Sequence, residues 1–116
     1  IAHEISHAFD NNAARFDENG SLKNWWTESD YKEFERRTQK AIEVFDGYQD
    51  VYGKVNGKLT VSENIADMGG FSCALEAAQK EKHFDAKKFF EKWASMWKAK
   101  YKKETALQLL HTDVHA

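Results

Sequence analysis

Two histidines one helical turn apart constrain this chain more than any other feature. His3 and His7 end the run His3-Glu4-Ile5-Ser6-His7, which matches the pattern H-E-x-x-H. Residues i and i+4 share one face of an α-helix, so both imidazoles can reach one cation if this segment is helical. Zinc accepts such nitrogen ligands in tetrahedral geometry. The spacing therefore predicts a zinc-binding helix, with Glu4 beside the metal as the base that takes a proton from its water. The alternative is a surface helix that carries two histidines by chance.

A third ligand decides the class of zinc site. A metzincin would carry glycine and then histidine three and six residues after His7, but those positions hold Asp10 and Ala13. Glutamate is the other common third ligand of catalytic zinc, which leaves several acids to consider. The candidates are Glu18, Glu28, Glu63 and other surface acids.

The segment around Glu63 favours it as that ligand. Glu63 and Asp67 are four residues apart on one helix face, so one acid can bind the metal while the other accepts the N–H of a ligating imidazole. Gly69 and Gly70 would destabilise a helix interior unless a neighbouring backbone comes close, as a zinc helix packed there would. The alternative that Glu63 is a solvated acid near a helix start stays open at this point.

Bulk composition excludes several function classes. The chain has 116 residues, a formal net charge of -2 and one cysteine, so it has no internal disulfide and no basic character suited to nucleic acid. No run approaches the roughly 20 apolar residues of a membrane span. Because the chain opens at Ile1 inside an expected helix and stops at Ala116 without a closing element, we expect residues 1–116 to be part of one longer domain, truncated at both ends.

Apolar spacing and capping residues predict a mainly α fold. The expected helices span 1–14, 27–46, from 60 or 62 to about 82, from 85 onward, and about 105–110. The expected N-caps of the second, third and fourth of these are Thr27, Thr60 or Ser62, and Asp85. Residues 15–26 are expected to form a loop or hairpin that turns at 17–20. Asn56-Gly57 lies between apolar residues and predicts a short β-hairpin within 48–60. We expect the four tryptophans to lie in the core, with a substrate cleft as the alternative, and Cys73 to be buried.

Four motifs in this order carry a resemblance to a known family. They are His3-Glu4-Ile5-Ser6-His7-Ala8-Phe9-Asp10, Asn24-Trp25-Trp26-Thr27, Glu63-Asn64-Ile65-Ala66-Asp67-Met68-Gly69-Gly70 and Thr112-Asp113-Val114-His115. Together they resemble the neprilysin family of zinc endopeptidases, nearly from end to end of the chain. The near absence of cysteine resembles the bacterial members more than the disulfide-rich animal enzymes.

The resemblance implies a fold and a metal site. The fold is the mainly α lobe of a thermolysin-like, or gluzincin, metallopeptidase catalytic domain. His3, His7 and Glu63 match the ligands of one zinc ion, and Glu4 matches the catalytic base.

The resemblance also assigns residues around the ligands. Asp10 and Asp67 match acids that accept hydrogen bonds from the ligating imidazoles. His115, which residue type alone would make a tail histidine, matches a catalytic histidine that stabilises the oxyanion, and Asp113 lies beside it. Two family features, a substrate-binding strand before the zinc helix and an arginine after the last histidine, are not in the sequence.

The expected function is hydrolysis of internal peptide bonds in oligopeptides by metal-activated water. One alternative is a zinc-binding but inactive fragment, because the substrate strand and the arginine are missing. A second alternative is a helical interaction module whose histidines are incidental. We expect no nucleic-acid partner, no membrane contact from this segment, and contact with the rest of the parent catalytic domain. For a bacterial member the cytoplasm is favoured, with the cell surface or secretion open.

Overall fold

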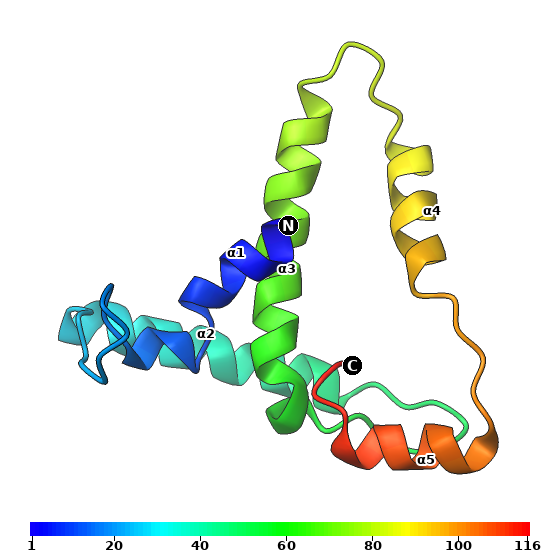
Figure 1. Cartoon of the computed structure of the whole chain (residues 1–116), viewed down its shortest axis with the longest axis horizontal. Coiled ribbons are helices and arrows are strands. Elements are labelled where there is room, and N and C mark those ends of the chain that lie inside the picture. Colours follow the sequence, from blue (N-terminus) through cyan, green and yellow to red (C-terminus); the bar gives the residue numbers. More distant parts are fainter.

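A computed structural model describes residues 1–116, and its regular structure is entirely helical (Figure 1). Five α-helices and two short 3-10 helices are present, and no β-strand forms, which confirms the mainly α fold expected from the sequence. No helix combines the length and the apolar character needed to cross a membrane. The α-helices are α1 Ala2–Ser6, α2 Glu28–Asp46, α3 Gly57–Gln79, α4 Ala86–Met96 and α5 Lys103–Thr112, and the 3-10 helices are η1 His7–Phe9 and η2 Ala13–Arg15.

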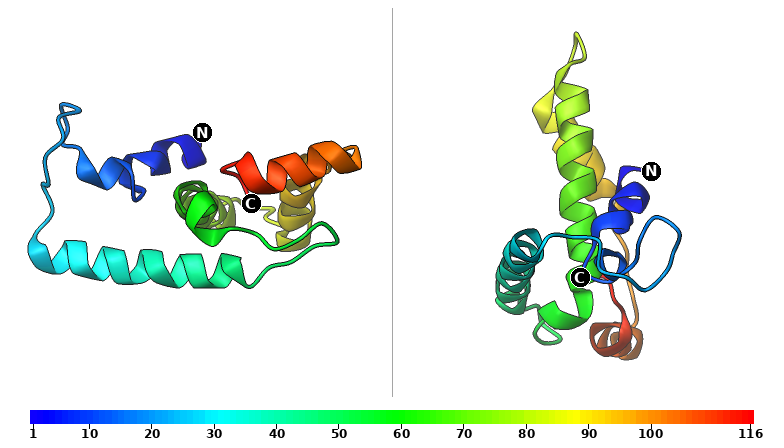
Figure 2. Two further views of the ribbon diagram at one scale, coloured as in Figure 1. Left: turned by 90° about the horizontal axis from the view of Figure 1, so that it is seen from below. Right: turned by 90° about the vertical axis from the view of Figure 1, so that its left-hand side faces the viewer.

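Helix α3 is the central element of the fold. It carries six of the eight buried residues of the chain. Helices α1 and α2 contact it on opposite sides, and the C-terminal segment returns to the side that holds α1 (Figure 2). Phe71 of α3 packs against three aromatic rings of α4 with centroids 4.9–5.5 Å apart. Elements distant in sequence therefore meet along one helix.

The helices are arranged in an open form around α3. The radius of gyration is 16.5 Å, whereas a compact chain of this length has about 13 Å. Trp25, Trp93 and Trp97 are 48%, 38% and 55% exposed, so the expectation that the tryptophans form the core is wrong for these three. Cys73 is exposed too, against the prediction that it is buried.

The predicted β-hairpin at Asn56-Gly57 is wrong, because this pair begins α3. The Asn56 side chain accepts a hydrogen bond from the backbone N–H of Leu59 at 3.0 Å, as an N-cap does. The Gly57 N–H donates to Asp46 Oδ1 at the end of α2, and a Cβ on Gly57 would lie 2.3 Å from the Ile42 carbonyl oxygen. Asparagine suits turns and caps alike, so the sequence pattern alone does not separate them.

The first helix is shorter than predicted and stops before Asp10. The chain was expected to be helical over 1–14, but α1 ends at Ser6, and η1 carries it only to Phe9. Asp10 is extended, and its Oδ1 accepts the backbone N–H groups of Asn12 and Ala13, both at 2.7 Å. In a continuing helix, the N–H groups of Asn12 and Ala13 would donate to backbone carbonyls four residues earlier. Here the Asp10 side chain accepts them instead, so the helix ends.

Other element boundaries are close to the sequence prediction. Thr27 caps α2 and Asp85 caps α4, as expected. The turn at 17–20 is present, with Gly20 at a φ of 75° and an isolated antiparallel bridge between Phe16 and Leu22 in place of a hairpin. Helix α5 is longer than the expected 105–110 at both ends.

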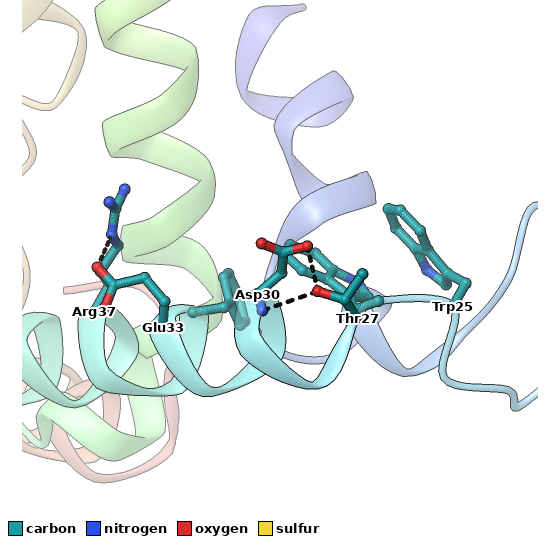
Figure 3. A pocket seen from close by; sticks show the side chains of 7 residues that line it. Trp25, Thr27, Asp30, Glu33 and Arg37 are labelled. Carbon is teal, nitrogen blue, oxygen red and sulfur yellow. Dashed lines mark hydrogen bonds and ion pairs between the residues drawn. The ribbon is translucent and has the colours of Figure 1, made fainter.

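A surface pocket of about 450 Å³ lies at the start of α2 (Figure 3). Glu33 accepts hydrogen bonds from Arg36 and Arg37, which lower the pKa of the Glu33 carboxyl to about 2. The Glu33 carboxylate is thus already paired with two guanidinium groups. None of the expected zinc ligands lines this pocket. The pocket is lined by Trp25, Trp26, Thr27, Asp30, Glu33, Phe34 and Arg37.

The N-cap at Asn56 gives a direct test of where α3 begins. Replacing Asn56 by alanine removes the acceptor for the Leu59 N–H, which costs about 1 kcal/mol, whereas Asn56→Asp keeps a good cap. We expect amide hydrogen exchange in the first turn of α3 to become about fivefold faster in Asn56→Ala and to stay near wild type in Asn56→Asp. Equal exchange in both variants would contradict the cap.

Candidate metal centre

The close approach of α1 to α3 brings the expected site residues together. A Cβ built on Gly70 would lie 2.5 Å from His3 N and 2.7 Å from His3 Cα, so only glycine fits at this contact. Gly69 is less crowded, because its nearest neighbour is the Ser6 side chain at 3.1 Å. The sequence expectation that a second helix presses on the zinc helix at these glycines agrees with this packing.

Three candidate ligand atoms converge where the helices meet. The Nε2 atoms of His3 and His7 are 3.0 Å apart, and Glu63 Oε2 lies 3.2 Å and 3.3 Å from them. The two imidazole rings stand nearly perpendicular, at 89°. Four ligands held tetrahedrally at about 2.0–2.1 Å from zinc are separated from each other by about 3.3 Å, close to these values. The structure thus groups one donor atom from each of His3, His7 and Glu63.

A carboxylate holds the other nitrogen of each imidazole. His3 Nδ1 lies 2.7 Å from Asp67 Oδ1, and His7 Nδ1 lies 2.8 Å from Asp10 Oδ2. A carboxylate accepts only, so each contact favours a proton on Nδ1 and leaves Nε2 of the neutral ring as a lone pair. Asp67 and Asp10 thus each contact the imidazole that the sequence analysis expected, and the Nε2 lone pair of each ring faces Glu63.

Asp10 is a buried carboxylate with a full set of hydrogen-bond donors. Its side chain is 6% exposed and accepts from His7, from two backbone N–H groups and from the hydroxyl of Ser62 at 2.8 Å. Burial by itself raises the pKa of the Asp10 carboxyl, but the bonds from Ala13, His7, Ser62 and Asn12 outweigh it and hold the pKa below its usual value. The same contact with Asp10 raises the pKa of His7.

The C-terminal segment adds a third imidazole beside Glu63. His115 Nε2 is 3.3 Å from Glu63 Oε2, and its Nδ1 lies 2.7 Å from Asp113 Oδ1. The contact with Asp113 raises the pKa of His115, while the backbone and side-chain bonds from His115 lower the pKa of Asp113. His115 is half exposed and lies outside the three-atom cluster, so it borders the centre from the solvent side.

Glu4 lies beside the three-atom cluster and is largely exposed. Its carboxylate is 4.0 Å from His3 Nε2, and its side chain is 78% exposed. This position beside the ligand cluster is the one expected of a base in the H-E-x-x-H pattern.

The donor set fits a zinc ion on the chemistry of its own atoms. Glu63 Oε2 is buried and has no hydrogen-bond donor, although three imidazole nitrogens surround it at 3.2–3.3 Å. Lone pairs that face a carboxylate oxygen at this distance repel each other unless a cation lies among them. Nitrogen and oxygen ligands at tetrahedral spacing are what zinc accepts.

Comparison with known proteins decides the family. Residues 1–116 match the model of peptidase family M13 over the full length of the chain. The chain belongs to peptidase family M13. The resemblance to the neprilysin family is thereby confirmed, and Neprilysin-11 of Caenorhabditis elegans is 36% identical over 132 aligned residues, covering 100% of this chain and 16% of that protein.

Two further relatives agree in sequence and in structure. A neutral endopeptidase of Lactococcus lactis subsp. lactis (strain IL1403) is 54% identical over 116 residues, 100% of this chain and 18% of the relative. The zinc metalloprotease Zmp1 of Mycobacterium tuberculosis, solved in complex with an inhibitor, superposes with a TM-score of 0.88 at 35% identity, over 99% of this chain and 20% of that one. The chain therefore spans about a fifth of the length of these relatives.

Two features of the M13 centre were not found from the sequence. Ser62 was considered only as a possible helix cap, yet its hydroxyl reaches Asp10 from α3. Trp93 and Trp97, which line the cavity beside Glu63, were expected to be core, with a substrate cleft as the alternative, and Phe71 beside them was not considered. No local sequence pattern indicates either feature, because each depends on contacts between segments more than 20 residues apart.

The contact at Gly70 predicts how the centre responds to one added methyl group. In the intact protein we expect Gly70→Ala to raise the zinc dissociation constant at least about tenfold, because the Cβ must push the His3 backbone away from Glu63. Zinc competition against a chelator measures this. The matched control is Gly69→Ala, whose Cβ meets a side chain that can rotate, and we expect a smaller effect. Equal zinc affinities of Gly70→Ala and the wild type would contradict this account.

Proposed function

We propose that the M13 protein containing this chain is a zinc-dependent endopeptidase that hydrolyses internal peptide bonds of oligopeptides. The observation that carries the proposal is the buried, donorless Glu63 Oε2 with the Nε2 atoms of His3 and His7 around it. The names of the relatives, a neutral endopeptidase and a zinc metalloprotease, support the same activity. His3, His7 and Glu63 would hold one zinc ion.

Glu4 is the proposed general base. When bound, zinc polarises the scissile carbonyl and lowers the pKa of a water molecule to about 7. The Glu4 carboxylate is exposed next to the cluster and makes no hydrogen bond that would occupy it, so it can accept the proton of the attacking water. It can then pass that proton to the leaving amine.

His115 is the proposed partner of the developing oxyanion. The hydrogen bond from its Nδ1 to Asp113 orients the ring and raises its pKa, which favours a proton on the Nε2 that faces the centre. A cationic N–H stabilises negative charge that develops on the substrate oxygen in the transition state. Asp113 acts by holding this ring in place.

An apolar cavity beside the centre supports a peptide substrate. It has a volume of about 500 Å³, and Glu63, Asp67 and His115 form its polar end. This arrangement suits a peptide whose apolar side chain enters the cavity while the neighbouring carbonyl faces the ligands. The cavity is lined by Phe45, Glu63, Asn64, Asp67, Met68, Phe71, Trp93, Ala94, Trp97, His115 and Ala116.

Two further proposals concern the rest of the catalytic domain and the compartment of the protein. The rest of the M13 catalytic domain would supply the substrate-binding strand and the arginine that the resemblance implies. The cytoplasm as the compartment of the protein stays a prediction.

Two substitutions separate metal binding from proton transfer. In the intact protein we expect Glu4→Gln to keep one zinc per chain and to lower kcat/KM for an oligopeptide by about 10²–10⁴, because only the base is lost. We expect Glu63→Ala to lose zinc under the same conditions, because one of three ligands is gone. Zinc content by elemental analysis and peptide cleavage by mass spectrometry measure the two effects.

Glu18→Gln is the matched control, since Glu18 is an exposed glutamate in the turn at 17–20. It should leave both zinc content and cleavage unchanged. Stoichiometric zinc without any cleavage by the wild-type protein would favour the alternative of an inactive zinc-binding chain. Absence of zinc from the wild type, with no loss of stability in a chelator, would favour the helical interaction module instead.

Removal of the metal gives an independent prediction. Dialysis of the intact protein against a chelator should abolish cleavage and lower the melting temperature, because zinc binds the folded protein and not the unfolded chain. Zinc added back should restore both. A melting temperature that does not respond to zinc would count against the centre.

A further inference from the structure

The two ligating imidazoles are joined to α3 by different routes. Asp67 is itself a residue of α3, so its bond to His3 links that ring directly to the helix that carries Glu63. Asp10 follows His7 by three residues in the same segment, so the bond between them makes no link to α3. The His7 side of the centre needs another connection.

Ser62 supplies that connection. Its hydroxyl donates from α3 to Asp10 Oδ2 over 2.8 Å, and the same oxygen accepts His7 Nδ1 at 2.8 Å. Only two side-chain hydrogen bonds join residues 1–15 to α3, and they are Ser62 to Asp10 and His3 to Asp67. The two bonds lie on either side of Glu63 in the sequence, so they fix both histidines relative to the same carboxylate.

The alternative role for Ser62, a helix cap, does not apply. Asn56 caps α3, and Ser62 lies well inside the helix, where backbone N–H groups already have carbonyl partners. Serine inside a helix has a lower helix propensity than alanine. Nothing in the local structure of α3 therefore requires a hydroxyl at this position.

The burial of Asp10 makes the hydrogen bond from the Ser62 hydroxyl difficult to replace. The carboxylate is buried, so a lost donor is not readily replaced by water. If Oδ2 turns toward another donor, the His7 ring follows it, because the His7 bond is to the same atom. A rotation of this ring moves Nε2 away from Glu63.

We propose that Ser62 is a positioning residue of the zinc centre, which holds the Asp10 carboxylate and through it the His7 ring in the geometry that closes on Glu63. The proposal rests on zinc binding by His3, His7 and Glu63 as proposed above. It requires no direct contact between Ser62 and metal or substrate.

Four variants of the intact protein test the proposal. Ser62→Thr and Ser62→Val have nearly the same size and shape but differ in the hydroxyl, and Ser62→Ala removes it with the least disturbance. Ser72→Ala is the matched control, an exposed serine on the same helix. Far-UV circular dichroism checks that each variant keeps its helices.

The readouts are the zinc dissociation constant and the rate of zinc loss to a chelator. Direct partners of a ligating histidine are worth about 10–100-fold in metal affinity, and Ser62 acts one bond further away. We expect Ser62→Ala and Ser62→Val to bind zinc about three- to tenfold more weakly and to release it faster. Ser62→Thr and Ser72→Ala should stay within about twofold of wild type. The visible spectrum of the cobalt-substituted protein should change in the first pair and not in the second.

Each other outcome counts against the proposal in a distinct way. Equal zinc affinities of Ser62→Val and Ser62→Thr would show that the hydroxyl does not position the Asp10 carboxylate. Tighter zinc binding by Ser62→Ala would mean that Ser62 only draws charge from Asp10, since a carboxylate with fewer donors makes His7 a more basic ligand. Absence of zinc from the wild type would overturn the proposed function and this inference together.

Discussion

The contact between α1 and α3 governs the geometry of the centre. It occurs at Gly70, where the His3 backbone occupies the space that any Cβ would need. The distance between the helices is therefore set by backbone against backbone, which leaves little room for variation. Because His3 and His7 are on one segment and Glu63 is on the other, this contact sets how closely the two segments bring the three candidate ligands together.

Hydrogen bonds around the cluster then decide the direction of each ring. Every imidazole near Glu63 has its Nδ1 against a carboxylate, from Asp67, Asp10 and Asp113. At His3 and His7 this leaves two Nε2 lone pairs that face the Glu63 carboxylate oxygen. Such a group of acceptors is unfavourable by itself and favourable around a cation, which is the physical basis of the proposed zinc site.

Burial within the chain is concentrated on α3. Few residues are buried, and most of those are on α3, so local packing is concentrated where the ligands are held. The aromatic side chains of α4 that face the cavity, Trp93 and Trp97, are partly exposed.

Local sequence was sufficient for part of the site and insufficient for the rest. The H-E-x-x-H spacing determined that two imidazoles share one helix face, because helical geometry alone relates residues four apart. Glu63 with Asp67, followed by the two glycines, indicated a second helix in close contact. The caps at Thr27 and Asp85 were recognised for the same reason, since each depends on residues only three apart.

The sequence by itself therefore determined the chemical types at the centre and the helices that carry them. It did not determine that Asn56-Gly57 begins a helix, because the Asp46 carboxylate and the Ile42 carbonyl that select this outcome come from α2. Nor did it determine that Ser62 reaches Asp10, 52 residues away, or that His115 returns to Glu63. These contacts join segments distant along the chain, and only the packing of whole helices brings such segments within hydrogen-bonding distance.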